Sequence, residues 1–368
     1  MSVQVSYKNQ FFLGLVIFLV LLLVVEGSAR LYELINPHCT FLDKDAFSKT
    51  DYLLVRIICL DHNNRVFETD TILLLSPNQH SQTININSHG FRGPETTLEK
   101  PENTYRIFVV GGSTTFGVGA TSDQTTIPGY LQKKFDESAL DFNVEVINAG
   151  IGRGDSATES YYIKTKLVNF DPDMFIIYDG WNDAINPVQY VEYEDITKEI
   201  VEDEKIEPFR FANYPFYRTP FVVHDILFWD PDPVGYNIVD PDLISIKTEL
   251  WEKRWKSNCE INSKNQIKTI VTVQPILGTG DKSLSTDELF MVPKLDEHKT
   301  PILIIDSLAQ TLPNLDAYCD GAHDLRGIYD NIEDPVYFDL GHPTDFGNEI
   351  IAQKFYEIVL PFVMENKK

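Results

Sequence analysis

The sequence predicts an α/β protein: a three-layer α/β/α sandwich around a central parallel sheet, preceded by one membrane-spanning helix. Short, fully apolar runs at Arg106 to Val110, Val144 to Ile147, Met174 to Tyr178 and Thr269 to Val273 are typical of strands buried on both faces. The segments between them are long enough for helices, which favours right-handed crossovers and a parallel sheet. An uninterrupted apolar stretch near the N-terminus predicts the spanning helix.

That apolar stretch runs from Phe11 to Val25 and lies within a predicted anchor of residues 1–30. Lys8 precedes it and Glu26 follows it, so the positive-inside rule favours a cytoplasmic N-terminus and an extracytoplasmic main domain. A signal peptide, cleaved near Gly27-Ser28-Ala29 to give a secreted protein, is the alternative.

Residues 31–100 are predicted to form an accessory segment with short apolar runs at Leu53 to Leu60 and Ile72 to Leu75. Residues 101–368 then form the main domain. Within it, about 184–240 is first acidic and then rich in aromatic residues and proline, which indicates an inserted cap over a substrate cleft or an insert that packs on the sheet.

Beyond the insert, Leu243 to about Gln266 and Asp345 to Met364 have helical composition or spacing. Apolar runs at Pro301 to Ile305 and Val336 to Phe338 are predicted to be further strands.

Composition excludes several classes of function. A net charge of −24 would repel a phosphate backbone, so no nucleic-acid partner is expected. The four cysteines form no C-x-x-C pair and the aspartate-rich turns lack the spacing of an EF-hand loop, so we expect no metal site. The sequence leaves open whether the cysteines form disulfides or remain free thiols.

A serine follows the first strand of the main domain, in Gly111-Gly112-Ser113-Thr114-Thr115-Phe116-Gly117. The glycines let the chain turn sharply and present the Ser113 hydroxyl at the start of a helix, where it is free to attack. The alternative is that Ser113 is only a helix N-cap. A Walker A loop is excluded because Val118 stands where its lysine belongs, and the lipase elbow is excluded because Thr115 replaces its last glycine.

Three more polar loops follow predicted strands: Asn148 to Ser156, Asp179 to Asp183, and Asp339-Leu340-Gly341-His342. In an open parallel sheet, the carboxyl ends of the strands share one edge, where ligands bind. A carboxylate three residues before an imidazole, at the edge that also holds Ser113, favours a proton relay over a structural histidine.

These four blocks, in this order, resemble the SGNH/GDSL hydrolase superfamily over about residues 101–365. The resemblance implies a flavodoxin-like sandwich, a serine esterase without a cofactor, and a catalytic set of Ser113, Asp339 and His342. It also implies an oxyanion hole made by Ser113, Gly152, Arg153 and Asn182. Anchored members of the family look similar in Asn87 to Gly93 as well, where the sequence suggests no role.

Two positions depart from the family pattern. Gly112 replaces the usual aspartate before the nucleophile, which we expect to matter little because that aspartate takes no part in the proton relay. Arg153 stands where the family places its oxyanion glycine, but a backbone N–H can still serve.

The resemblance implies an ester substrate, and an anchored, outward-facing enzyme favours short acyl groups on a glycan or other surface molecule. Three alternatives stay open. The first is an O-acyltransferase, the second a lipase or phospholipase, and the third a non-catalytic surface binding protein on the same fold.

Overall fold

The computed structural model describes residues 6–36, 39, 42–69, 72–188, 218–228, 240–297 and 299–365. Two compact units are distinguished, one of residues 1–40 and 208–233 and one of residues 41–207 and 234–368. Most of the predicted cap at 184–240 lies outside the described residues.

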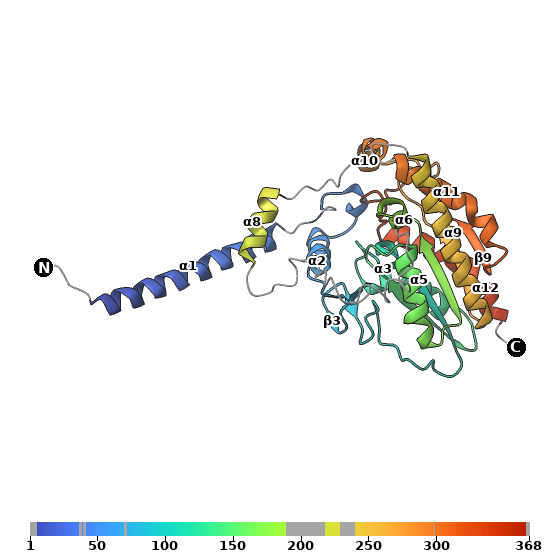
Figure 1. Cartoon of the computed structure of the whole chain (residues 1–368), viewed down its shortest axis with the longest axis horizontal. Helices are drawn as coiled ribbons and strands as arrows, with labels where there is room; N and C mark the ends of the chain where they lie inside the picture. Colours follow the sequence, from blue (N-terminus) through green and yellow to red (C-terminus); the bar gives the residue numbers. More distant parts are fainter. Residues whose placement is uncertain are drawn as a thin grey trace. The chain divides into compact units, whose positions relative to one another are not determined.

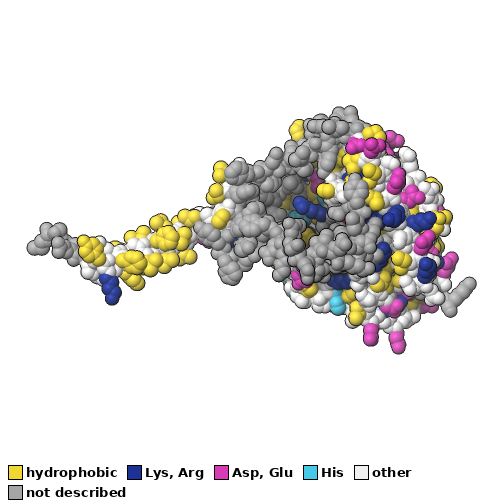
Figure 2. Space-filling view, in the orientation of Figure 1, with side chains coloured by type: hydrophobic (Ala, Val, Ile, Leu, Met, Phe, Trp, Pro, Cys, Tyr) yellow, Lys and Arg dark blue, Asp and Glu magenta, His cyan; other side chains and the backbone are white. Residues whose placement is uncertain are grey.

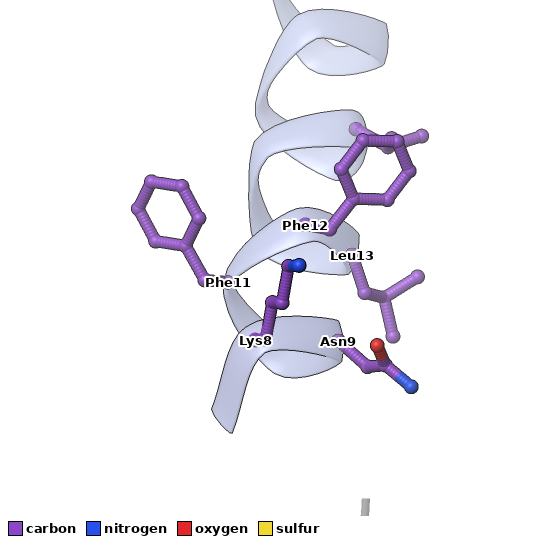
Figure 3. Close-up of a pocket in the computed structure, with 6 residues that line it drawn as sticks. Lys8, Asn9, Phe11, Phe12 and Leu13 are labelled. Carbon is purple, nitrogen blue, oxygen red and sulfur yellow. The ribbon is translucent and has the colours of Figure 1, made fainter. Parts of the chain in front are cut away.

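The described residues of the first unit form two helices, α1 (Tyr7–Ile35) and α8 (Thr219–Phe228). Tyr7–Glu33 is long and apolar enough to cross a membrane, with a hydropathy of 2.6, and it is the one such helix in the described residues. Figure 2 shows its apolar side chains along most of the helix, with a cationic side chain near the N-terminal end. The surface space near that end is lined by α1 alone, and Figure 3 shows Phe11, Phe12 and Leu13 projecting from it in different directions.

The second unit is built on a five-stranded parallel sheet of order β6-β5-β7-β8-β9. The four apolar runs described above form its first four strands. The strands are β5 (Thr104–Gly111), β6 (Asn143–Gly150), β7 (Met174–Asp179), β8 (Lys268–Val273) and β9 (Gly321–Asp324). Gly111 lies opposite both Gly150 and Tyr178, so three strands end at one edge.

Alternate residues of the strands face two separate apolar layers, which explains why the runs are continuously apolar. Phe108 and Val110 of β5 pack with helices α5 (Ser156–Thr165), α9 (Pro241–Lys264) and α11 (Lys299–Leu315). Ile107 and Val109 pack with α4 (Ile127–Asp136) and α12 (Asp345–Glu365). The predicted three-layer α/β/α fold is therefore confirmed (Figure 1).

Two predicted strands are wrong. Pro301 to Ile305 lies in α11, whose buried Ile304, Ile305, Leu308 and Leu312 are spaced as on one helix face. Val336 to Phe338 is a loop that makes one antiparallel bridge, Tyr337 to Pro343. The fifth strand is instead β9, which a disulfide between Cys319, just before it, and Cys259 joins to α9.

Shorter elements complete the second unit. The apolar run Leu53 to Leu60 lies in a helix, α2, and Ile72 to Leu75 overlaps strand β2. The accessory elements are η1 (Asp45–Phe47), α2 (Tyr52–Asn63), β1 (Phe67–Thr69), β2 (Leu73–Leu75), β3 (Gln79–His80) and β4 (Asn85–Ile86). Those of the main domain are α3 (Ser113–Phe116), η2 (Asp123–Thr125), η3 (Leu167–Phe170), α6 (Trp181–Ile185) and α10 (Thr286–Glu297).

Candidate active site

Ser113 is the first residue of α3, a single helical turn that begins directly after β5. Gly112, and not Ser113, occupies the N-cap position, so the N-cap alternative is wrong. Gly111 is required for close packing, because a Cβ atom there would overlap Thr115 and the carbonyl oxygen of Tyr178. Gly117 ends the turn with a φ of 92°, which favours glycine. The sharp turn inferred from the glycines thus places the Ser113 hydroxyl at the carboxyl end of the sheet.

Ser113, His342 and Asp339 form a continuous row. The Oγ atom of Ser113 lies 2.7 Å from Nε2 of His342. On the other side of the ring, Nδ1 lies 2.8 and 2.9 Å from the two carboxylate oxygens of Asp339. A hydroxyl, an imidazole and a carboxylate in this order can pass a proton from the hydroxyl to the ring.

The Asp339 carboxylate is held in its ionised form. Burial alone would raise its pKa, but the His342 ring and hydrogen bonds from the backbone N–H groups of Gly341 and His342 together lower it. Those two N–H groups donate to Oδ1 at 2.9 and 2.8 Å. An ionised carboxylate beside Nδ1 favours a proton on that nitrogen, which leaves Nε2 as the acceptor for the serine proton.

Packing fixes the orientation of the His342 ring. The Phe338 ring stacks on it with a centroid distance of 5.7 Å and an interplanar angle of 15°. Phe47 of the accessory segment also contacts the Phe338 ring, with a centroid distance of 5.3 Å. The backbone N–H of Leu277 donates to the carbonyl of Leu340, which ties the histidine loop to the segment after β8.

Asn182 is buried in α6, and its Nδ2 donates to the carbonyl of Gly154 at 2.6 Å. A Cβ atom at residue 112 would overlap this Nδ2 atom. The glycine before the nucleophile therefore allows the amide to lie against the nucleophile turn, whereas the small effect expected from the missing aspartate stays a prediction. An amide nitrogen carries two N–H groups, so one stays available for a substrate oxygen.

The glycine-rich loop after β6 makes a tight turn in which the N–H of Gly154 donates to the carbonyl of Ile151 at 2.9 Å. Arg153 adopts a φ of 66°, and its side chain is exposed. The Gly154 N–H is used within the turn, so Gly152 and Arg153 are the remaining donor candidates in this loop. Asn186 Nδ2 donates to the Arg153 carbonyl at 3.1 Å and joins the turn to the residues after α6.

The Asn87 to Gly93 stretch supports the nucleophile turn. The buried Arg92 donates through Nη1 to the carbonyls of Phe116 and Gly117, at 3.1 and 2.7 Å. Its Nε pairs with Asp123 at 2.8 Å, with both side chains buried. Arg92 thus satisfies carbonyls at the C-terminal end of α3 that a one-turn helix leaves unpaired. This role of the stretch could not be inferred from its residues alone.

Behind Asn182 lies a buried cluster of acidic side chains that sequence reasoning missed. Asp183 accepts hydrogen bonds from the backbone N–H of Ser156, at 2.8 Å, and from its hydroxyl. Asp179 accepts from the indole of Trp251 at 2.9 Å. Burial raises the pKa of Asp179 to about 6, and burial with the neighbouring Asp179 raises the pKa of Asp183 well above its ordinary value.

Lys247 of α9 closes this cluster by donating to the backbone carbonyls of Asp183, Ala184 and Asn186 at 2.7–2.9 Å. Lys247 and Trp251 are one turn apart on a helix that reads from its sequence as an ordinary amphipathic element. No signal in the sequence connects this helix with the loop after β7.

The accessory segment contributes a second histidine near His342. Burial, together with the positive charges of Arg65, His342 and Arg92, lowers the pKa of His62 well below its ordinary value. Arg65 donates to Nε2 of His62 at 2.9 Å, and its guanidinium lies over the Phe116 ring at 4.7 Å. The sequence pattern of 31–100 gave no reason to place these side chains beside the nucleophile turn.

The described part of the chain contains no group of three or more His, Cys, Asp and Glu side chains arranged to hold a metal ion. What the site offers chemically is a hydroxyl paired with an imidazole, and amide N–H groups beside them.

No protein-family model and no curated protein matches the sequence. Among solved structures, a protein assigned to the G-D-S-L lipolytic family from Desulfitobacterium hafniense is 12% identical, with a TM-score of 0.40, over 69% of this chain and 98% of its own. An acetylxylan esterase from Geobacillus stearothermophilus is 12% identical over 69% and 93%, with a TM-score of 0.39. Another acetyl xylan esterase is 15% identical over 69% and 99%, also at 0.39. At these identities the likeness concerns the arrangement of the fold alone.

Proposed function

We propose that this chain is a serine esterase that cleaves ester bonds through an acyl-enzyme, with Ser113 as nucleophile, His342 as general base and Asp339 as its partner. One observation carries the proposal: the row in which Ser113 Oγ lies 2.7 Å from His342 Nε2 and Asp339 lies 2.8 Å from Nδ1. One ring nitrogen of His342 contacts a serine hydroxyl at the start of a helix, and the other contacts a carboxylate. A histidine with a purely structural role does not require this pair of partners.

In the acylation step, His342 Nε2 takes the proton of Ser113 as the hydroxyl oxygen attacks the ester carbonyl. The ionised Asp339 stabilises the imidazolium that forms. The same proton then passes from Nε2 to the leaving alcohol, so the ester C–O bond breaks and the acyl group stays on Ser113. Water, deprotonated by His342, releases the acid in the second step.

The negative charge on the carbonyl oxygen needs hydrogen-bond donors that are fixed in advance. The backbone N–H of Ser113 is unpaired within the helix because it belongs to the first turn. The second N–H of the Asn182 amide and a backbone N–H of Gly152 or Arg153 would complete the oxyanion hole. The contact of Asn182 with Gly154 supports this role, since it fixes the amide in one orientation.

We further propose that α1 anchors the protein in a membrane with the N-terminus in the cytoplasm and the catalytic unit outside. Lys8 before the apolar stretch and Glu26 after it support this orientation. The substrate would then be a short acyl ester, such as an acetyl group, on a glycan or lipid that the outer surface meets.

The test uses the full-length chain purified in detergent, with Ser113→Ala as its partner variant. We expect wild-type protein to release acetate from acetylated xylan or from p-nitrophenyl acetate. Ser113→Ala should lower kcat by a factor on the order of 10⁶, as loss of a serine nucleophile does elsewhere. A matched control is Ser138→Ala, which removes a hydroxyl that contacts Tyr356 Oη at 2.7 Å and should leave kcat unchanged.

The products distinguish the related functions. Acetate in water, with no gain when a glycan acceptor is added, supports hydrolysis, whereas transfer to the acceptor would make the chain an acyltransferase. A rate that rises with acyl chain length would favour a lipase. Equal, near-background rates for wild type and Ser113→Ala on every ester would contradict the proposal and favour a binding protein.

A further inference from the structure

The last turns of α1 hold a second helix in place. The side-chain carboxylate of Glu26 accepts hydrogen bonds from the backbone N–H groups of Arg218, at 2.8 and 2.9 Å, and Thr219, at 3.1 Å. The Thr219 hydroxyl donates to the same carboxylate at 3.0 Å. A carboxylate in this position accepts hydrogen bonds from N–H groups at the N-terminal end of α8. Its negative charge also interacts favourably with the positive end of the helix dipole.

A second charged residue of α1 strengthens the contact. The Arg218 guanidinium pairs with Glu33, with Nε at 3.1 Å from both carboxylate oxygens. Among the described side chains of α1, those that are buried or half-buried form one stripe along the helix: Leu22, Glu26, Ala29 and Glu33. This stripe is the surface on which α8 packs, and it begins at Leu22, inside the apolar stretch.

The far side of α8 is apolar and exposed. Val223, Ile226 and Leu227 are 48%, 54% and 65% exposed, whereas Val222 is buried. The three exposed residues are spaced i, i+3 and i+4, so they share one face of the helix. A short helix with an apolar face in water loses the free energy that burial of these side chains would supply.

The length of the apolar stretch indicates what covers this face. The uncharged residues between Lys8 and Glu26 rise about 25 Å as a helix, a few ångströms less than the ~30 Å hydrocarbon core of a bilayer. Glu26, which holds the start of α8, would therefore lie at or just within the boundary between acyl chains and headgroups. Interfacial helices bury their apolar faces at this depth.

We propose that α8 is an interfacial helix whose Val223, Ile226 and Leu227 lie in the headgroup and acyl-chain boundary of the bilayer that α1 spans. The occupant of the apolar face is thus lipid, and α8 is tied to the membrane surface both by α1 and by its own side chains. The proposal rests on the membrane anchoring proposed above, but not on the esterase chemistry.

The test measures fluorescence quenching of the full-length chain in liposomes of phosphatidylcholine, with and without bromine on the acyl chains. Leu227→Trp and Val223→Trp place a reporter on α8, Phe12→Trp places one in the span, and Leu98→Trp places one on a 51% exposed position of the second unit. The unsubstituted chain gives the baseline for the native tryptophans. We expect brominated lipid to quench the added fluorescence at residues 12, 223 and 227, and to leave that at residue 98 unchanged.

The variants separate the ways in which the inference can fail. Quenching at residue 12 but not at 223 or 227 would overturn the α8 proposal while the anchor stands. Absence of quenching at residue 12 as well would overturn the anchor and, with it, this inference. Hydrolysis of p-nitrophenyl acetate by the same samples reports separately on the proposed chemistry.

Discussion

Asp339 and Asp183 are two aspartates beside the same row of polar side chains, but their environments are opposite. Asp339 accepts two backbone N–H groups and faces the His342 ring, and its pKa is lowered. Asp183 accepts from Ser156 but lies next to Asp179 in a buried cluster, and its pKa is raised. Both residues are part of the family-like blocks, so their position in the sequence does not distinguish them.

The difference shows how environment assigns a role to a carboxylate. An ionised aspartate can stabilise the imidazolium that forms during catalysis, whereas a protonated one contributes hydrogen bonds and no charge. We therefore assign Asp339 to the proton relay and Asp183 to positioning α6, which carries Asn182. The following substitutions test this division, from the largest expected effect to the smallest.

Asp339→Asn and Asp183→Asn form a matched pair, because each replaces a carboxylate with an amide of the same shape. Asp339→Asn should lower kcat by about 10⁴, because the amide cannot hold the ring in the required tautomer. Asp183→Asn should cost no more than about tenfold, which corresponds to ~1.4 kcal/mol in the barrier. Rates on p-nitrophenyl acetate measure both, and equal losses would mean that the two carboxylates do not have distinct roles.

Asn182→Ala removes one proposed oxyanion donor. We expect kcat to fall by about 10²–10³, with KM little changed, because the interaction strengthens only when the oxyanion forms. Asn186→Ala is the control, since its amide donates to the Arg153 carbonyl on the same turn. If KM rises while kcat is constant, Asn182 binds the substrate in its ground state instead.

Gly112→Ala should act through Asn182, because the added methyl group would overlap its Nδ2 atom. We expect a loss in kcat that approaches that of Asn182→Ala. The double variant should lose little more than Asn182→Ala alone, since both changes remove the same donor. Losses that multiply in the double variant would contradict this coupling.

The smallest expected effect concerns stability against pH. The folded state keeps protons on Asp179, whose pKa is raised to about 6, and on Asp183, whereas the unfolded chain releases them near pH 4. The unfolded state therefore binds fewer protons above pH 4, and the contribution of these groups to stability falls as pH rises toward 6. Asp183→Asn removes one such group. The urea midpoint of the variant minus that of the wild type should therefore become larger as the pH is raised from 4.5 to 7. A difference that is constant with pH would contradict a protonated Asp183.

The sheet and the row of Ser113, Asp339 and His342 could be anticipated because their signals are local. Continuous apolar runs mark β5 to β8, and the order of strands brings their end loops to one edge. The run Pro301 to Ile305 was misread because a short apolar run on a buried helix looks the same as a strand. The edge strand β9 has the sequence Gly-Ala-His-Asp and carries no apolar run at all.

Some parts of the site depend on contacts between residues that are far apart in the sequence, and no local sequence pattern predicts these contacts. Lys247 and Trp251 reach the loop after β7 only because α9 packs across the sheet. His62 and Arg65 come from the accessory segment, far from the family-like blocks. Arg92 lies in the stretch Asn87 to Gly93, but its hydrogen bond to the carbonyl of Gly117 could not be inferred from spacing.

The most direct test of the central claim is covalent labelling of the nucleophile. A fluorophosphonate probe should modify wild-type protein at Ser113, as mass spectrometry of the labelled peptide would show. Labelling should be lost in Ser113→Ala and strongly slowed in His342→Gln, because the hydroxyl then lacks its base. A probe that modifies another serine, or that labels His342→Gln as fast as wild type, would contradict the account.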